Sequence, residues 1–572
     1  MFLNISFSLL AGVFLIFLLS SLGFIFNLSI SPQYIITGLL TTFAIFSVRL
    51  YFEKTSFKRI LFYCMLLAAA LVAAVYLSAY LMDASYDGRA YHQVSVLLLN
   101  KGWNPIYDNI TSFCTKHFGF APYELLWCEN YVKFSEIFAA NILTFTNKIE
   151  TGKVFNIISA ATTFFYIYYV FSKESFLNIC SNAKNKLSAR TKTVFAFLLI
   201  YNPVVVAQFF TYYIDGLLYL YFLIAAFSVV DYITGNLNSK GRITPLLIFI
   251  MSSVILVNIK LGGVFCFICI LLGTAVFLLS GKIKPDSKIK TFKIKPFLYS
   301  VFIIFLLALL TGINPYFTNI AKGRHALHPL TGKEKIDIIT PNSPKAFRNK
   351  PSYYKFFASV FSKTDNFHTV RNKNPEFKIP FTVYKSEISP VKDVDTRVAG
   401  FGVFFSGIFL FGLILFFTSF YKKCILCKKY RSENSLTSNE ALFLLFLIFG
   451  LSVILNSENW WARYVPQLWA LLIFTALFTY SAYFENIYFK KAVIGLFLAI
   501  MFTNTLFINI LNLEWSKRYT KRTKENIYKI KTLSTLQGRE ANLQKLPETK
   551  PMNISFLRKL DEARIKYKSR TN

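Results

Sequence analysis

The sequence has 572 residues, of which 54% are hydrophobic, and its mean hydropathy is +0.46. A soluble protein of this size is rarely so apolar, so the composition favours an integral membrane protein. The net charge of +34 would by itself suit nucleic acid. However, short basic loops alternate along the chain with neutral or acidic loops, as the positive-inside rule predicts. We therefore expect membrane lipid, and no nucleic acid, as a partner.

The apolar runs are close to the length that crosses a bilayer as a helix, and they predict an all-α polytopic bundle within residues 1–512. A basic tail, 513–572, follows. The first run lacks a small-residue cleavage site and a second run follows at once, so we interpret it as a retained helix. About thirteen transmembrane helices are expected, near residues 5–25, 33–51, 60–82, 153–172, 193–210, 213–232, 244–258, 262–281, 297–313, 399–420, 441–456, 465–484 and 492–512.

Clusters of Lys and Arg predict which loops face the cytoplasm. They lie near residues 54–59, 173–192, 282–290 and 422–431. Counting spans from a cytoplasmic N-terminus then places three long segments on the opposite side. These are the first outer segment (83–152), the second outer segment (314–398) and the tail.

Two carboxylates stand where the third apolar run ends. Asp83 and Asp87 are four residues apart, so a continuing helix would place both on one face. Two like charges at such a short distance raise the pKa of one of the two groups. One carboxylate is then suited to act as a base, and the other to orient a substrate or bind a metal. His92 and Tyr91 lie just beyond. Asp87-Gly88 also predicts a turn, and the alternative interpretation is a helix cap. We select Asp87, Asp83 and His92 as catalytic candidates.

The rest of the first outer segment predicts two short helices. Residues 89–100 place apolar side chains on one helical face and end before Gly102. We expect this helix to lie on the outer membrane surface, and the apolar patch 137–145 to do the same. Cys114 and Cys128 share the segment and are candidates for a disulfide in an oxidising compartment.

The second outer segment contains a basic and histidine-rich stretch. Arg324 offers a bidentate guanidinium to phosphate oxygens, and His325 and His328 offer ring nitrogens. The spacing of the two histidines would also suit a shared metal, although no local carboxylate or cysteine completes a ligand set. The alternative is a solvated loop.

A short outer hairpin between two predicted spans contains Trp460, Trp461 and Arg463. The arginine is a candidate for holding a diphosphate, with the two aromatic side chains bordering lipid or sugar. In the alternative interpretation, the tryptophans belong to an aromatic belt at the membrane interface, and the arginine only extends its charged end to the water.

Together these stretches resemble the polytopic membrane glycosyltransferases of the GT-C class, in particular large bacterial members. The resemblance implies a GT-C-like bundle in the bacterial inner membrane with its active site facing the periplasm. It implies a polyprenyl-phosphate or polyprenyl-diphosphate sugar donor, and a glycan, lipid or protein acceptor. Asp83 or Asp87 would deprotonate the acceptor or bind a divalent metal such as Mg²⁺ or Mn²⁺. Basic outer residues would hold the donor phosphate. The resemblance rests on residues 86–93, 102–105, 325–329, 335–344 and 460–466.

Two other functions remain open. A long outer segment with Arg and His is also typical of an O-antigen polymerase or ligase. A transporter or flippase of lipid-linked sugars would place ionisable residues near the bilayer midplane and break helices there. Here the polar residues gather at the predicted outer surface, and Asn202-Pro203 is the obvious break within a span.

Overall fold

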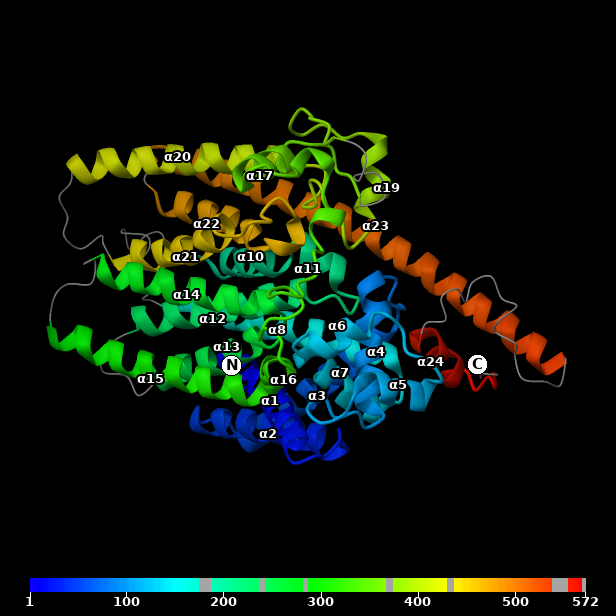
Figure 1. Ribbon diagram of the computed structural model, residues 1–572. Helices are drawn as coiled ribbons and strands as arrows, with labels where there is room; N and C mark the ends of the chain where they lie inside the picture. Colours follow the sequence, from blue (N-terminus) through cyan, green and yellow to red (C-terminus); the bar gives the residue numbers. More distant parts are fainter. Residues whose placement is uncertain are drawn as a thin grey trace.

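The computed structural model describes residues 1–173, 187–235, 242–280, 287–366, 374–429, 437–482, 484–536 and 554–567. Within these ranges the regular elements are helices, accompanied by two isolated β-bridges. Parts of the predicted cytoplasmic loops lie outside the described residues, namely 174–186, 282–286 and 430–431, as does His368. Nine described helices are long and apolar enough to cross a membrane, which confirms an all-α polytopic fold (Figure 1). They are α1 (Phe2–Ile25), α2 (Pro32–Phe52), α3 (Phe57–Ala79), α8 (Val154–Ser172), α12 (Asp215–Thr234), α14 (Leu261–Leu279), α15 (Ser287–Thr311), α20 (Phe405–Lys429) and α23 (Ile487–Leu536).

The remaining predicted spans form shorter helices. Three of them are apolar: α13 (Ile243–Val257), α21 (Thr437–Ile454) and α22 (Gln467–Ser481). The run 193–210 is divided into α10 (Ala189–Ile200) and α11 (Pro203–Gln208). Pro203 has no backbone N–H to donate and therefore cannot continue α10. The Asn202 side chain caps the new helix, α11, by accepting from the Val204 amide at 2.9 Å.

The first outer segment folds into a compact set of short helices. They are η1 (Gly88–His92), α4 (Gln93–Asn100), α5 (Ile110–Phe118), α6 (Leu125–Asn130), α7 (Phe134–Thr146) and η2 (Ile149–Lys153). Gly102 has φ +99°, which confirms it as the stop after α4. However, α4 is buried on all sides from Gln93 to Leu99, and α7 is buried from Phe134 to Leu143. The predicted placement of both helices on the membrane surface is therefore wrong.

The candidate disulfide between Cys114 and Cys128 is not formed in the structure. Cys114 and Cys128 are both buried free thiols. Each donates to a backbone carbonyl, Cys114 to Phe120 at 3.4 Å and Cys128 to Tyr91 at 3.2 Å. Burial raises the pKa of Cys114 to about 11, so this thiol stays protonated at neutral pH.

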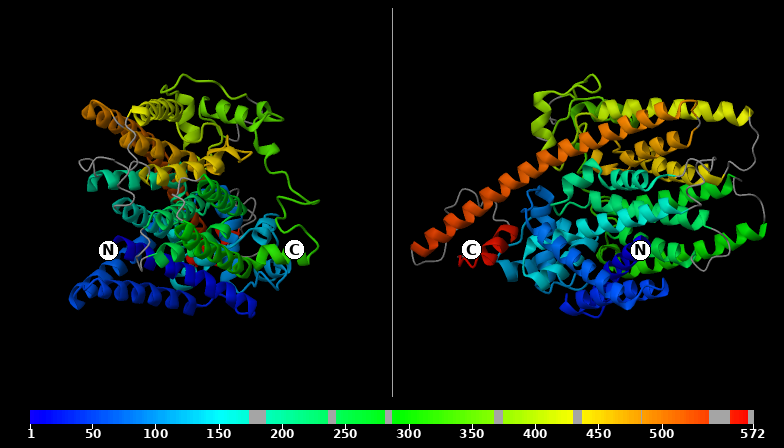
Figure 2. Two further views of the ribbon diagram at one scale, coloured as in Figure 1. Left: turned by 90° about the vertical axis from the view of Figure 1, so that its left-hand side faces the viewer. Right: turned by 180° about the vertical axis from the view of Figure 1, so that it is seen from behind.

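The second outer segment and the tail complete the same end of the molecule. The second segment forms η4 (Ile313–Phe317), α16 (Thr318–Ala321), η5 (Thr340–Asn342), η6 (Lys345–Phe347), α17 (Ser352–Val360), η7 (Lys385–Glu387) and α19 (Ile388–Val391). The last span, α23, runs through residue 512 without a break, and α24 (Ile554–Glu562) returns to pack on α4. Figures 1 and 2 show α4, α5, α7, α19 and α24 at one end of the bundle, which we call the loop end; α15 and α20 extend towards the opposite end.

Side chains join the two outer segments at the loop end. The buried Lys133 ammonium, between α6 and α7, donates to the Asn314 side chain and to the Tyr131 carbonyl, the latter at 2.7 Å. Burial lowers the pKa of Lys133 to about 8. Asn314 in turn donates to the Pro105 carbonyl at 2.9 Å. The segments therefore form one packed cap on the helices.

Candidate functional site

Arg463 is the centre of a buried charge cluster at the loop end. It lies in the short turn η9 (Ala462–Tyr464) between α21 and α22. Its Nη1 atom is 3.3 Å from an oxygen of Asp87 and 3.3 Å from an oxygen of Asp395. The three side chains are only 12–19% exposed. The fold thus brings the first outer segment, the second outer segment and the hairpin to one guanidinium, and we call these three residues the Arg463 cluster.

Aromatic rings surround this guanidinium. Its carbon lies over the rings of Tyr213, Trp461 and Tyr464, with distances to the ring centroids of 5.3, 4.8 and 5.2 Å. Such cation–π contacts strengthen when water is excluded. Burial, and then the nearby charge of Asp87, raises the pKa of both Tyr91 and Tyr213 well above the ordinary value. Both phenols are therefore neutral and able to donate hydrogen bonds.

Two buried donors without an acceptor lie in and beside the Arg463 cluster. Among the described residues, Nε of Arg463 and Nε1 of Trp461 are buried N–H groups without a hydrogen-bond acceptor. A buried donor without a partner costs about 1–3 kcal/mol, so such groups in a native structure call for an explanation. An anionic ligand with several oxygen atoms would satisfy both.

Asp395 is a buried carboxyl group with a raised pKa. Burial raises the pKa of Asp395 to about 6, against the opposing effect of Arg463 and of Arg397. Arg397 pairs with Asp395 at 3.1 Å and lies over the Trp461 ring at 4.6 Å. A carboxyl group with this pKa is mostly ionised at neutral pH yet is a stronger proton acceptor than an ordinary aspartate.

A second ion pair adjoins the cluster on the side of the bundle. Lys260 contacts Asp215 at 2.6 Å, and its ammonium lies over the Tyr464 ring at 4.7 Å. Asp215 also accepts from Gln208 at 3.3 Å. Tyr464 therefore lies between the Lys260 ammonium and the Arg463 guanidinium.

Asp83 is separated from Asp87 because α3 ends at Ala79, and no helix carries the two carboxylates on one face. Asp83 is fully buried and its oxygens accept from the backbone and side chain of Ser85, at 2.8 and 2.6 Å, and from the Tyr212 amide at 2.8 Å. A Cβ on Gly88 would lie 2.0 Å from the Asp83 carboxylate. Asp83 thus anchors the turn that leads into Asp87.

His92 is likewise held inside the protein. Its Nδ1 atom is 2.6 Å from Oε1 of Glu136, and both side chains are nearly inaccessible. The other Glu136 oxygen accepts from Ser135 at 2.9 Å. His92 therefore lies next to Tyr91 in the sequence, but its partner belongs to α7 and not to the Arg463 cluster.

The stretch around Arg324 has its own partners. Arg324 is 3.4 Å from Glu129 and 3.8 Å from Glu334, and Lys322 pairs with the same Glu129 at 2.6 Å. Arg324 and Arg463 share no ion-pair partner among the described residues. The phosphate-binding role predicted for Arg324 stays a prediction.

The two histidines near Arg324 have local roles. The Nδ1 atom of His325 is 2.6 Å from the Thr331 hydroxyl and accepts from the Leu327 amide at 3.1 Å, which closes the loop. The pKa of His328 is lowered by burial and by the charge of Arg324, so its ring is neutral at physiological pH.

The hairpin tryptophans are buried rather than exposed to lipid. Trp460 and Trp461 are 3% and 1% exposed, and they form a small core with Phe347 and Val398 of the second outer segment. The Trp460 ring packs edge-on against Phe347 at 5.1 Å. Neither side chain belongs to an aromatic belt. The Trp461 ring instead packs against the Arg463 guanidinium.

A divalent metal finds no ready ligand set in the part of the chain that the structure describes. No three His, Cys, Asp or Glu side chains are grouped there closely enough to hold an ion. Asp87 and Asp395, which face each other, are bridged by a guanidinium.

Asp395 and Tyr213 were not among the residues predicted from the sequence. A signal for Asp395 exists, since Asp393-Val394-Asp395 is a closely spaced acidic pair within a basic segment. The sequence contains no such signal for Tyr213, because nothing distinguishes it from the other tyrosines among the 33 in the chain.

No protein-family model and no curated protein matches the chain. Among solved structures, the chain is similar to the crystal structure of the oligosaccharyltransferase of Archaeoglobus fulgidus in the apo form, with a TM-score of 0.41 and 12% sequence identity. The alignment covers 78% of this chain and 56% of that protein, so the chain spans little more than half of its length. A similarity at this level assigns neither a family nor an activity.

Proposed function

We propose that the protein is a membrane glycosyltransferase of the GT-C type, which transfers a sugar from a polyprenyl-phosphate or polyprenyl-diphosphate donor to a cell-envelope acceptor. The observation that carries the proposal is the Arg463 cluster. One guanidinium with a free N–H is held between two carboxylates at the loop end. A group that binds an oxyanion and groups that accept a proton are the parts that such a transfer needs.

In the proposed reaction, a carboxylate of the cluster takes the proton of the acceptor hydroxyl. The acceptor oxygen forms a bond to the anomeric carbon while the bond from that carbon to the phosphate oxygen breaks. The phosphate oxygen leaves with the electron pair, and the Arg463 guanidinium stabilises the added negative charge. When donor phosphate enters, it replaces a carboxylate as the partner of Arg463. That carboxylate then becomes free to accept a proton.

Asp87 and Asp395 are the two candidates for the proton-accepting carboxylate in the proposal. Asp87 is the carboxylate that the sequence already singles out, and Asp395 has the raised pKa of a better base. Tyr213 supplies a neutral hydroxyl group near both carboxylates, and Tyr91 supplies one near Asp87. Arg324, His325 and His328 stay predicted ligands for further phosphate or sugar oxygens. We place the site on the periplasmic side of a bacterial inner membrane, because the basic loops are predicted on the other side.

The test uses the purified full chain in lipid nanodiscs with synthetic polyprenyl-phosphate hexoses, and measures release of polyprenyl phosphate. We expect Asp87→Asn to lower turnover by about 10²-fold or more, because the amide keeps the shape but cannot accept a proton. Arg463→Lys should weaken donor use although it keeps the charge, because an ammonium lacks the planar fork that binds phosphate. Asp337→Asn is the matched control. Asp337 is exposed on the second outer segment and accepts from the Ile339 and Thr340 amides at 3.0 and 2.9 Å, contacts that an asparagine oxygen can also make.

The results that contradict the proposal are equally specific. Unchanged turnover in Asp87→Asn would make that carboxylate a structural partner of Arg463 only. If no polyprenyl-phosphate or polyprenyl-diphosphate sugar is consumed by the unmodified protein, the donor class itself is wrong.

A further inference from the structure

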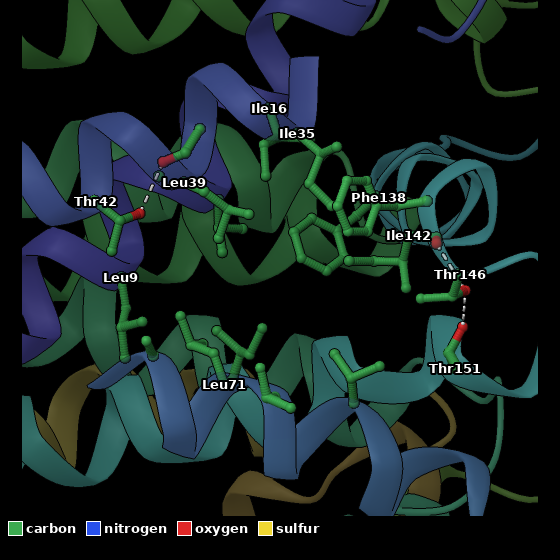
Figure 3. A pocket seen from close by; sticks show the side chains of 18 of the residues that line it. Leu9, Ile16, Ile35, Leu39, Thr42, Leu71, Phe138, Ile142, Thr146 and Thr151 are labelled. Atoms are coloured by element: carbon green, nitrogen blue, oxygen red, sulfur yellow. Dashed lines mark hydrogen bonds between the residues drawn. The ribbon is translucent and has the colours of Figure 1, made fainter. Parts of the chain in front are cut away.

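A deep apolar groove lies at another part of the molecule, between α1, α2, α3, α7 and α8. Its volume is about 540 Å³, within the ~300–1,000 Å³ typical of small-molecule sites. The lining is almost entirely apolar, as Figure 3 shows with Leu9, Ile16, Leu71, Phe138 and Ile142. Arg463, Asp87 and Asp395 are absent from the lining, so the groove is separate from the Arg463 cluster.

Close packing of α1 on α2 and the loose fit of α3 produce this groove. A Cβ on Gly12 would lie 1.9 Å from the Thr42 hydroxyl, and one on Gly38 would lie 2.3 Å from Ile16, so the two helices touch through their glycines. By contrast, only 6% of the apolar window of α3 is buried. Its outer face carries large side chains such as Met65 and Leu66, which are 55% and 52% exposed and do not line the groove. The groove therefore lies behind a helix that itself faces lipid.

The length of the groove matches one leaflet of a bilayer. On α3 its lining runs from Ala68 to Ala79, eleven residue steps, which at a rise of about 1.5 Å each is ~16 Å. Half of a hydrocarbon core is ~15 Å. A saturated acyl chain anchored in one leaflet has this reach, whereas a polyprenyl chain is much longer than a leaflet.

The polar end of the groove is at the loop end. Thr146 and Thr151 share a hydrogen bond of 2.6 Å there, and Lys148 lines the groove while its side chain is exposed (Figure 3 labels the two threonines). Lys148 takes part in none of the ion pairs found among the described residues. Arg558 of α24 is next to it, because it donates to the carbonyl of Asn147 at 2.8 Å. Arg558 is itself paired with Glu562 at 3.2 Å, and Glu562 accepts from the Ile149 amide at 2.7 Å, so Lys148 is the cation at the mouth that no carboxylate pairs among the described residues.

We propose that this groove binds one acyl chain of an anionic phospholipid from the leaflet at the loop end, with the headgroup phosphate at Lys148. The chain would pack between α3 and α7 in the space that the protein leaves open. The phosphate would lie at the interface, where a lysine side chain can reach it from the start of η2. The inference does not rest on the proposed transfer reaction.

The experiment places the purified full chain in nanodiscs that contain phosphatidylglycerol with a diazirine on one acyl chain. After illumination, mass spectrometry of peptides locates the label. We expect it on Phe138 and Ile142 of α7, which are 2% and 6% exposed and lie behind α3. Leu71→Trp should fill the groove and lower this labelling by about tenfold. Leu66→Trp is the matched control on the outer face of the same helix and should leave the labelling unchanged.

Lys148→Gln and competition in the unmodified protein test the headgroup without a change in the groove. We expect unlabelled phosphatidylglycerol to compete, phosphatidylcholine to compete poorly, and Lys148→Gln to remove the difference. Label confined to exposed residues such as Leu66 would mean ordinary surrounding lipid and would overturn the proposal. Equal competition by phosphatidylcholine, or competition by polyprenyl phosphate alone, would overturn the anionic phospholipid as occupant.

Discussion

Replacement of Arg463 by glutamine tests whether the Arg463 cluster is a buried ion network or a loose surface contact. The substitution removes the cation and leaves Asp87 and Asp395 facing each other with 19% and 15% exposure. Breaking a buried pair in this way costs about 3–5 kcal/mol of unfolding free energy. An exposed pair is typically worth ~0–1 kcal/mol. Arg518→Gln is the control, because its pair with Glu514 is 66% and 44% exposed.

The cost of Arg463→Gln should depend on pH. Burial raises the pKa of Asp395 to about 6, above the ~3.9 expected in an unfolded chain. The folded protein therefore holds a proton on Asp395 that the unfolded chain does not, and the stability that this contributes is full below pH ~4 and lost as the pH rises through 6. Loss of Arg463 removes an influence that lowers this pKa, so the protonated form persists to higher pH. The destabilisation should be smaller at pH 5 than at pH 8.

The assay is unfolding in mixed detergent micelles followed by tryptophan fluorescence, since Trp460 and Trp461 adjoin the cluster. Adding Asp395→Asn to the Arg463→Gln protein should recover part of the loss, with a coupling energy of about 0.5–3 kcal/mol. If Arg463→Gln costs no more than Arg518→Gln, or if the two substitutions are additive, the three side chains do not form a coupled network.

Three further outcomes are expected. Gly88→Ala should destabilise the protein by about 1–3 kcal/mol, because its Cβ would lie 2.0 Å from the Asp83 carboxylate; Gly450→Ala, with nothing within 4 Å, should be neutral or stabilising, and thermal unfolding of both compares them. If the proposed transfer is correct, its rate should rise as the pH passes through 6 and Asp395 ionises; a flat profile from pH 5 to 8 would exclude Asp395 as the base. A topology reporter fused after residue 350 should be active outside the cytoplasm, and a cytoplasmic signal there would place half of the site on the wrong side of the membrane.

Hydropathy was sufficient to predict the helical bundle, because a membrane span needs a long apolar run whatever it packs against. The break at Asn202-Pro203 and the stop at Gly102 were also visible, since both depend on the backbone chemistry of single residues. The sequence did not reveal that α4 is buried. Its Gln93 amide oxygen accepts from Ser555 of the tail, 462 positions away, and no local pattern marks such a contact.

The site was predicted only in part, for a related reason. Asp87 and Arg463 were both candidates, but the sequence assigned them to different tasks and could not show that they lie in contact. Asp83 has the same residue type as Asp87 and a similar position after an apolar run. Its role as an anchor depends on the Tyr212 amide, which is 129 positions away. Residue type and spacing therefore selected candidate residues, while the contacts among them depended on the folded chain.

The tail supports the turn that presents Asp87, although the sequence marks it only as basic. Glu150 accepts from the Asp83 amide at 3.1 Å and pairs with Lys153 at 2.6 Å and with Lys559 of α24 at 3.0 Å. One carboxylate of the first outer segment thus faces two ammonium groups, one of which comes from the tail. Asp83 contacts that carboxylate through its backbone amide and Tyr212 through its side chain. These two contacts fix the start of the turn. The position of Asp87 against Arg463 is therefore determined by contacts from the bundle, the first outer segment and the tail together, which is why α24 belongs to the framework of the site.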